Sequence, residues 1–179
     1  MRAFGIVGWS GSGKTTYLEG VIKALVADGL SVATIKHAHK RFDMDRPGKD
    51  SYRHRAAGAR QVLVTSPDRW ALLTETPDDG DGLSLGRALA RLDPCDVVLV
   101  EGYRGAEAEK IEVWRAARGG APLYAADPRI IAVASDVAEA ALPAPLAGRP
   151  LLPLNRPADA ASLIRDRIAH PAGRQEAEG

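Results

Sequence analysis

The sequence predicts an α/β fold in which a mostly parallel sheet is covered by helices, with an added antiparallel β-hairpin. Short all-apolar runs at 3–7, 97–100 and 130–134 are typical of strands buried on both faces. Helical patterns at 14–28 and 155–169 alternate with strands, which favours a parallel sheet. Two apolar runs, 61–65 and 70–74, are separated by the turn sequence Ser-Pro-Asp-Arg, which predicts the hairpin.

The segments between these elements complete the expected order along the chain. Apolar runs at 31–35, 111–115 and 151–154 predict three more strands, and helices are expected at 50–58 and 83–92. We expect a single domain over residues 1–170. The small and polar residues of 171–179 predict a disordered tail.

Charge is unevenly distributed along this chain of 179 residues, although the formal net charge is only +1. Residues 36–60 contain eight Lys and Arg against three Asp, a local charge of +5. The low net charge excludes a globally basic nucleic-acid binder, whereas the cationic segment at 36–60 indicates an anionic ligand.

The sequence also predicts a cytoplasmic location. The lone Cys95 permits no internal disulfide, and no apolar run is long enough to cross a membrane.

A glycine-rich loop follows the first predicted strand and matches the pattern G-x-x-x-x-G-K-[ST] over residues 8–15. Glycines let successive N–H groups point at phosphate oxygens, and the following helix adds its positive end. Lys14 is expected to reach the β- and γ-phosphates, and the Thr15 hydroxyl to bind Mg²⁺. This context predicts a P-loop NTPase three-layer fold. The predicted nucleotide-binding residues here are Gly8, Ser10, Gly11, Ser12, Gly13, Lys14, Thr15 and Thr16.

A P-loop also needs a carboxylate near its metal, at the C-terminal end of a neighbouring strand. Glu101 follows four apolar residues and precedes a glycine, so it is expected at such an end. We predict that Glu101 acts on Mg²⁺ directly or through water. The alternative is a solvated carboxylate at a strand end.

The cationic segment follows the second predicted strand and leaves it at the same edge of the sheet as the P-loop. Asp43 and Asp45 could reach the metal or orient the attacking water, and we assign Asp45 with Glu101 as catalytic and metal-binding. Lys36, Lys49, Arg53 and Arg55 could bind a second anion, and we assign Lys36, Lys49 and Arg53 to ligand binding. Two alternatives stay open: a solvated charged loop, and a Zn²⁺ site formed by His37, His39, Asp43 and His54.

The sequence indicates the bound base less clearly. The motif Asn-Lys-x-Asp, which guanine-specific P-loop proteins often carry after a late strand, is absent. Asp136 ends the apolar run that begins at Ile130, and its carboxylate could accept from the N1 and N2 donors of guanine. A turn or helix-capping role for Asp136 is equally compatible with the sequence.

Several motifs together resemble the MobB family of molybdopterin-guanine dinucleotide biosynthesis adapter proteins. The resemblance covers residues 1 to about 160, and its middle block is more specific than the P-loop. It rests on the P-loop, Lys36-His-Ala-His39, Phe42-Asp-Met-Asp45, Pro47-Gly-Lys-Asp-Ser51, Arg53-His-Arg55, Ala57-Gly-Ala59, Val100-Glu-Gly-Tyr103, Lys110-Ile-Glu-Val113, Asp127-Pro128 and Ala134-Ser-Asp136.

The resemblance implies a GTP-binding protein with Mg²⁺-dependent, weak GTPase activity. It implies assistance to the molybdenum cofactor guanylyltransferase MobA, contact with the molybdenum-insertion enzyme, molybdopterin as a second ligand, and a homodimer.

Two other functions compete with this interpretation. In a small-molecule kinase, Asp43 or Asp45 would be the general base and the basic segment would hold an anionic acceptor. A nucleic-acid or regulatory module ranks last, because the basic segment is short and has few aromatic residues.

Overall fold

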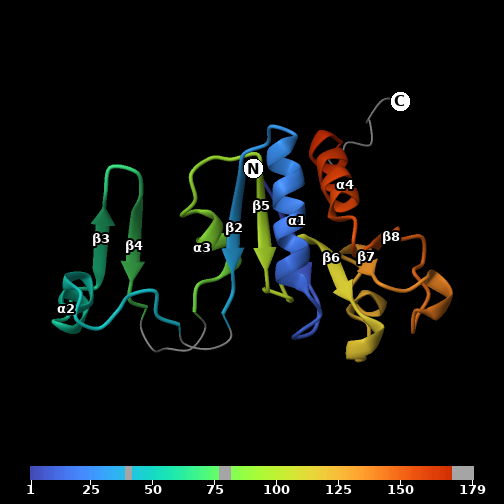
Figure 1. Cartoon of the computed structure of the whole chain (residues 1–179), viewed down its shortest axis with the longest axis horizontal. Helices are drawn as coiled ribbons and strands as arrows, with labels where there is room; N and C mark the ends of the chain where they lie inside the picture. The colour runs from blue at the N-terminus through green and yellow to red at the C-terminus, as the bar shows by residue number, and fades with distance from the viewer. Residues whose placement is uncertain (39–41, 77–81, 171–179) are drawn as a thin grey trace, which may run out of the picture. The chain divides into compact units, whose positions relative to one another are not determined.

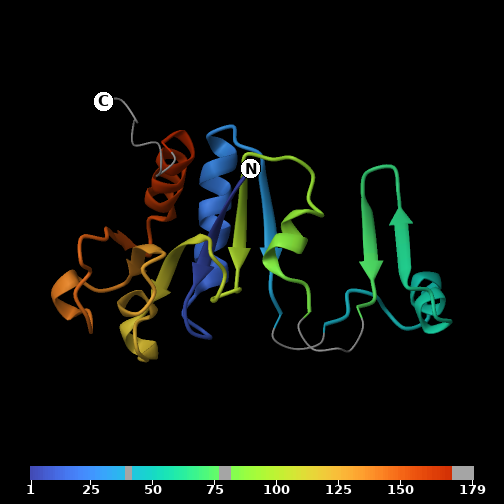
Figure 2. The ribbon, with the colours of Figure 1, turned by 180° about the vertical axis from the view of Figure 1, so that it is seen from behind.

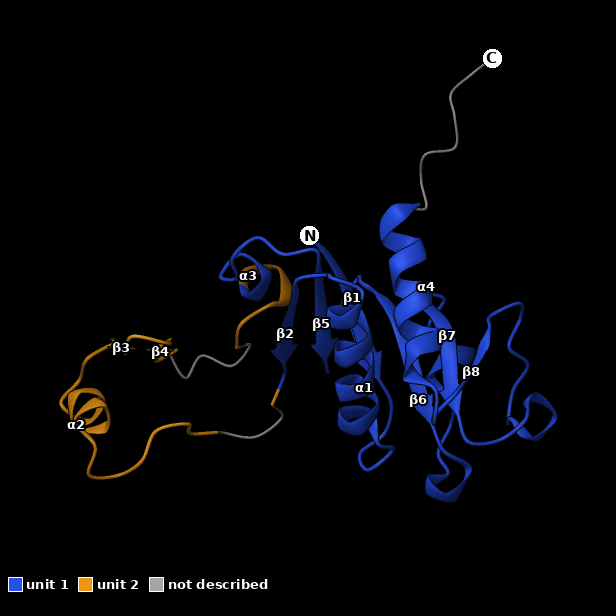
Figure 3. Cartoon of the chain, turned by 45° about the horizontal axis from the view of Figure 1, so that its top comes forward, with its two compact units in different colours: residues 1–37, 88–179 blue, residues 38–87 orange. Residues whose placement is uncertain are grey.

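The computed structural model describes residues 1–38, 42–76 and 82–170 in two compact units. Unit 1 comprises residues 1–37 and 88–179, and unit 2 comprises residues 38–87 (Figure 3). A single domain over residues 1–170 stays a prediction. The expected tail at 171–179 lies outside the described residues.

Unit 1 is built on a parallel sheet, as the alternating pattern predicts (Figure 1). The strand order is β2-β5-β1-β6-β7-β8, and every neighbouring pair is parallel. The C-terminal ends of these strands therefore meet at one edge of the sheet. The strands are β1 (Arg2–Val7), β2 (Val32–Lys36), β5 (Val97–Glu101), β6 (Glu109–Trp114), β7 (Ile130–Ser135) and β8 (Leu151–Pro153).

Two helices pack side by side against one face of the sheet: α1 (Lys14–Ala27) and α4 (Pro157–Ala169). Phe4 and Ile6 of β1 are fully buried in the core beneath them, together with Leu25 of α1 and Ile164 of α4. The two helices lie so close that a Cβ atom on Gly20 would come within 2.4 Å of the Pro157 ring.

A second cluster of buried side chains packs on the opposite face of the sheet. Figure 2 shows the ribbon from behind, with the segments that follow β6 and β7. Tyr124 and Leu146 lie in loop segments and pack on Val7, Trp114 and strand β7. Three short 3₁₀ helices in these segments were not predicted, because a single turn has no hydrophobic period. They are η1 (Ala116–Arg118), η2 (Leu123–Ala125) and η3 (Glu139–Ala141).

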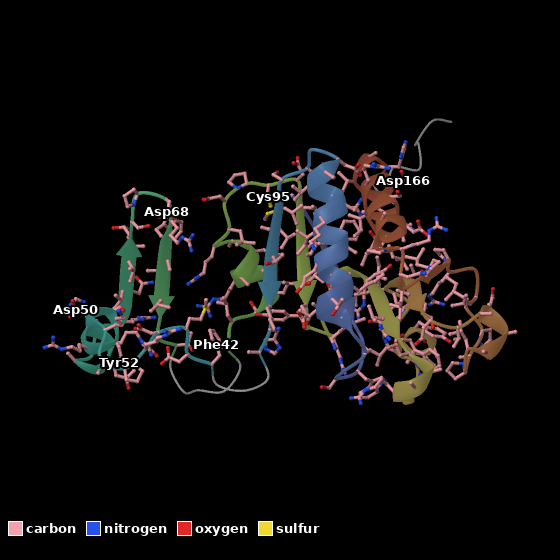
Figure 4. The ribbon with its side chains drawn as sticks, viewed as in Figure 1. Phe42, Asp50, Tyr52, Asp68, Cys95 and Asp166 are labelled. Atoms are coloured by element: carbon pink, nitrogen blue, oxygen red, sulfur yellow. The ribbon has the colours of Figure 1, made fainter. Side chains whose placement is uncertain are left out.

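Unit 2 contains the predicted hairpin as a separate two-stranded antiparallel sheet of β3 (Gln61–Thr65) and β4 (Trp70–Thr74). Asp68 lies in the turn between them (Figure 4). The helix α2 (Asp50–Ala56) precedes β3 and contacts it.

Some predicted boundaries differ from the structure. The helix expected at 83–92 is only α3 (Leu85–Leu89), which spans the boundary between the units. The strand expected at 111–115 begins earlier, at Glu109, because the charged residue Lys110 is accommodated in the core by an ion pair with Asp127. Among the described helices, none is long and apolar enough to span a bilayer.

Candidate functional site: the phosphate loop and the strand ends beside it

The glycine-rich loop connects β1 to α1, and three of its glycines have positive φ angles. These are Gly8 at 146°, Gly11 at 75° and Gly13 at 91°, a region that other residues rarely adopt. A Cβ atom on Gly8 would also lie 2.4 Å from the carbonyl oxygen of Val113. Glycine is therefore required both for the path of the loop and for its close approach to β6.

The amide groups at the end of this loop are available to an anion. The N–H groups of Gly11, Gly13, Lys14 and Thr15 donate no hydrogen bond to any residue that the structure describes. They lie at the N-terminus of α1, where the helix dipole favours negative charge. Unpaired amides at the positive end of a 14-residue helix fit a phosphate group.

The structure brings Thr15 and Glu101 together, as the sequence predicts for a magnesium site. Thr15 Oγ1 donates to Glu101 Oε1 at 3.2 Å, and Lys36 Nζ lies 3.6 Å from Glu101 Oε2. Glu101 ends β5 directly between Ile6 of β1 and Lys36 of β2. A hydroxyl and a nearby carboxylate suit Mg²⁺, which takes its remaining ligands from phosphate and water.

Lys14 folds back over the loop, and its Nζ donates to the carbonyl oxygen of Trp9 at 2.9 Å. Partial burial lowers the pKa of Lys14; Glu101 opposes this shift, while Arg104 and Lys36 add to it. The excess of positive charge around the ammonium group favours a polyanion at this position.

Three arginines also donate to carbonyl oxygens of the loop. Arg104 Nη2 donates to Gly8 at 2.7 Å, Arg115 Nε to Ser12 at 3.0 Å and Arg118 Nη2 to Ser10 at 2.9 Å. The sequence patterns did not assign these three arginines to the phosphate loop. The only sequence signal for them was their position soon after the ends of β5 and β6.

Asp136 lines an open pocket of about 560 Å³ at the ends of β7 and β8. Its Oδ1 accepts from the Ala116 N–H at 3.4 Å, and its Oδ2 lies 3.9 Å from Arg115 Nη1. Arg115 also contacts Ser12, so the pocket adjoins the phosphate loop. The lining includes Ser135, Val137, Leu154 and Asn155.

The predicted residues of unit 2 form their own network. The Asp45 side chain is 7% exposed, and its Oδ1 accepts from the Ser51 hydroxyl at 2.9 Å and the Arg46 N–H at 3.0 Å. Its Oδ2 lies 3.5 Å from Arg55 Nη1. A metal-binding or catalytic role for Asp45 stays a prediction, but both of its oxygens already have partners within unit 2.

The two predicted anion-binding cations of unit 2 are exposed and lie four residues apart in sequence. Lys49 directly precedes α2, and Arg53 on α2 lies 3.6 Å from Asp50. Their assignment to anion binding stays a prediction.

The zinc alternative finds no support in the described part of the chain. No group of three or more His, Cys, Asp or Glu that could hold a metal occurs there. His37 belongs to unit 1, where its ring lies 4.4 Å from that of Tyr103, whereas Asp43 and His54 belong to unit 2. His39 lies outside the described residues.

The parallel sheet, the glycine loop and the helix that follows it define a P-loop-type α/β protein. The family model described as "Molybdopterin guanine dinucleotide synthesis protein B", or MobB, matches residues 3–136. The chain belongs to this family, and its role lies in molybdopterin guanine dinucleotide biosynthesis, as an adapter protein.

Individual relatives agree with the family match. The chain is 48% identical over 132 residues to the molybdopterin-guanine dinucleotide biosynthesis adapter protein of Escherichia coli, covering 72% of this chain and 75% of that one. It is 38% identical over 169 residues to the Haemophilus influenzae adapter protein, covering 93% and 89%.

Solved structures show the same fold. A MobB homologue from Bacillus stearothermophilus has a TM-score of 0.66 at 25% identity, over 94% of this chain and 99% of that chain. Bacillus subtilis MobB has a TM-score of 0.69 at 24% identity, over 93% and 98%.

Proposed function

We propose that this protein binds GTP with Mg²⁺ in the loop over residues 8–15 and uses the bound nucleotide to control its adapter role. The observation that supports this most directly is the contact between Thr15 and Glu101 beside the unpaired amides of the loop. Lys14 would bind the β- and γ-phosphates, while Thr15 and Glu101 would hold the metal.

Guanine is the base that the pocket suits best. The Asp136 carboxylate would accept from N1 and N2 of guanine, which adenine cannot match because its N1 is an acceptor. Asn155 lines the same pocket, and its side-chain NH₂ group could donate a hydrogen bond to guanine O6. Arg115 joins this pocket to the phosphate loop, as a nucleotide spanning both sites requires.

Turnover is expected to be slow. Hydrolysis needs a group that orients the attacking water, and Asp45 with its two oxygens engaged within unit 2 is poorly prepared for this task. We therefore propose that the nucleotide acts mainly as a switch for partner contact.

The expected partners are the guanylyltransferase MobA and the molybdenum-insertion enzyme. Molybdopterin, an anion, is the second ligand that we propose for the cationic segment with Lys49 and Arg53, in a cytoplasmic protein. A pull-down with and without a GTP analogue tests this: nucleotide-dependent capture of these enzymes supports it, and their absence from both samples contradicts it.

We also propose that the protein acts as a homodimer through the hairpin of unit 2. Leu63 is 59% exposed, Trp70 is 63% exposed and Leu72 is 45% exposed. Leu63 pairs with Leu72 and Thr65 with Trp70, so the three apolar side chains share one face of the sheet. Such a face marks an interaction surface.

Titration calorimetry with GTP and ATP, with Mg²⁺ and with a chelator, tests the nucleotide site. Lys14→Ala should weaken GTP binding by about 100-fold, because charge-assisted bonds worth about 3 kcal/mol are lost. The exposed Lys23 on α1 gives the control, because Lys23→Ala makes the same charge change. Unchanged affinity in a folded Lys14→Ala variant, or tighter binding of ATP than of GTP, contradicts the proposal.

A further inference from the structure

The segment that follows β6 lies directly on the phosphate loop. The Trp9 indole N–H donates to the carbonyl oxygen of Ala121 at 2.8 Å, and a Cβ atom on Gly120 would lie 3.1 Å from the same ring. A Cβ atom on Gly11 would lie 2.3 Å from Arg118 Nη2. The glycine at position 11 therefore makes room for the Arg118 guanidinium group.

The far end of this segment is anchored in the core by Glu112. Glu112 is fully buried on β6, and its carboxylate accepts from the N–H groups of Leu123 at 3.0 Å and Tyr124 at 2.7 Å. The Tyr124 hydroxyl donates in turn to the carbonyl oxygen of Ala144. Residues 115–124 are thus held at both ends, so the position of Arg118 is set by the core.

Arg115 directly precedes η1, and Arg118 is the last residue of this 3₁₀ turn. The Arg118 N–H donates to the Arg115 carbonyl oxygen at 3.1 Å, so the turn holds the two residues close together. Arg115 reaches Ser12 and Asp136, whereas Arg118 reaches Ser10. Arg115 therefore lies at the end of the loop beside the base pocket, and Arg118 lies further from it.

This order along the loop distinguishes the roles of the two arginines. A nucleotide with its base beside Asp136 passes Arg115 first, and its phosphate chain then runs along the loop. The terminal phosphate would lie nearest Ser10 and Gly11, where Arg118 contacts the loop. Arg118 has five N–H donors, so one can stay on Ser10 while others bind phosphate.

We propose that Arg118 binds the terminal phosphate of a nucleoside triphosphate and makes the site prefer triphosphate over diphosphate. This rests on the nucleotide binding proposed above. A cation supplied by the chain itself distinguishes the two nucleotides without a partner protein, because only the triphosphate carries a group within its reach.

Calorimetric titration of the full chain with Mg²⁺-GTP and Mg²⁺-GDP tests this proposal. Arg118→Ala should weaken GTP binding about 10-fold and GDP binding less than about 2-fold, because one charge-assisted contact is lost for GTP alone. Arg118→Lys should restore part of the preference. The control is Arg165→Ala, which makes the same charge change on α4, where Arg165 pairs with Asp28.

Equal losses for GTP and GDP, or no loss for either, in a folded Arg118→Ala variant would overturn the role of Arg118. Lys14→Ala separates this failure from failure of the nucleotide site. If Lys14→Ala abolishes binding of both nucleotides while Arg118→Ala leaves their ratio unchanged, only the Arg118 proposal is wrong. If Lys14→Ala has no effect, both proposals are wrong.

Discussion

The two units differ in how they treat apolar and charged side chains. Unit 1 buries most of the central strands β1, β5, β6 and β7 of its sheet. The charged side chains buried there have partners: Lys110 is 1% exposed and pairs with Asp127, and buried Glu112 accepts two backbone N–H groups. Unit 2 leaves Leu63 and Trp70 exposed on its hairpin and Phe42 (labelled in Figure 4) exposed at 72%.

This difference indicates two kinds of task. A fully packed sheet with paired charges can hold a phosphate loop in a fixed geometry. A two-stranded sheet with an exposed apolar face is marginal alone and gains stability from a binding partner. The rigid unit is therefore suited to nucleotide binding, and the open unit to protein contact.

The largest effect is expected at the buried ion pair of unit 1. Lys110 Nζ lies 2.8 Å from Asp127 Oδ2, and Arg129 Nε donates to Asp127 Oδ1 at 3.0 Å. Asp127→Asn leaves the buried ammonium group without its counter-charge and should lower the free energy of unfolding by about 2–3 kcal/mol. Chemical denaturation at pH 7 measures the change. Asp28→Asn, at an exposed pair, should cost less than about 1 kcal/mol.

The pH dependence of this effect follows from the pKa of Asp127. Burial alone would raise it, but hydrogen bonds from Lys110 and Arg129 outweigh burial and lower the pKa from 3.8 to about 2. A lowered carboxyl pKa stabilises the folded state above the unfolded-state value, and this stability is lost as pH falls through the folded-state value. The difference between wild type and Asp127→Asn should therefore shrink from pH 4 towards pH 2. A difference independent of pH would contradict this.

The sequence predicts features that depend on short local patterns. The glycine loop, its following helix, the hairpin and the position of Glu101 at the end of β5 all follow from residue type and spacing. The roles of Lys14, Thr15 and Glu101 stay predictions, although the structure brings these side chains together.

Features that depend on distant contacts were not predictable in this way. Arg104 and Arg118 look like ordinary loop arginines until the fold places them on carbonyl oxygens of the phosphate loop, about 100 residues away in sequence. The buried Lys110 breaks the apolar pattern of β6, and only its contact with Asp127 explains it. Asp45 likewise has partners in α2 that its sequence pattern did not reveal.

A smaller effect is expected when the apolar face of the hairpin is charged. Leu72→Lys places an ammonium group on the face shared with Leu63 and Trp70, so the dimer dissociation constant should rise at least about 10-fold. Analytical ultracentrifugation measures it, and GTP affinity should stay unchanged. Val26→Lys on α1, where Val26 is 55% exposed, is the matched control. If Leu72→Lys leaves the dimer dissociation constant unchanged, the interface lies elsewhere. If the wild type is monomeric, the proposed homodimer is wrong.

The smallest effect is expected inside unit 2, at Arg55. Its guanidinium group lies 2.8 Å from Asp43, 3.5 Å from Asp45 and 2.7 Å from Glu75, so it joins α2 to the segments on either side of the hairpin. The hydrogen bond from Arg55 lowers the pKa of Asp43, which indicates that the contact stabilises the carboxylate.

Arg55→Ala should therefore loosen unit 2 without unfolding unit 1. Hydrogen exchange followed by mass spectrometry should show that backbone amides of α2, β3 and β4 exchange a few-fold faster than in the wild type. An increase of this size is expected when unit 2 opens locally more often. Arg53→Ala is the control, because it makes the same substitution on α2 and removes an exposed ion pair with Asp50. Faster exchange in β1, β5 and α1 as well would show that the two units unfold together, and their different packing would then not separate their stabilities.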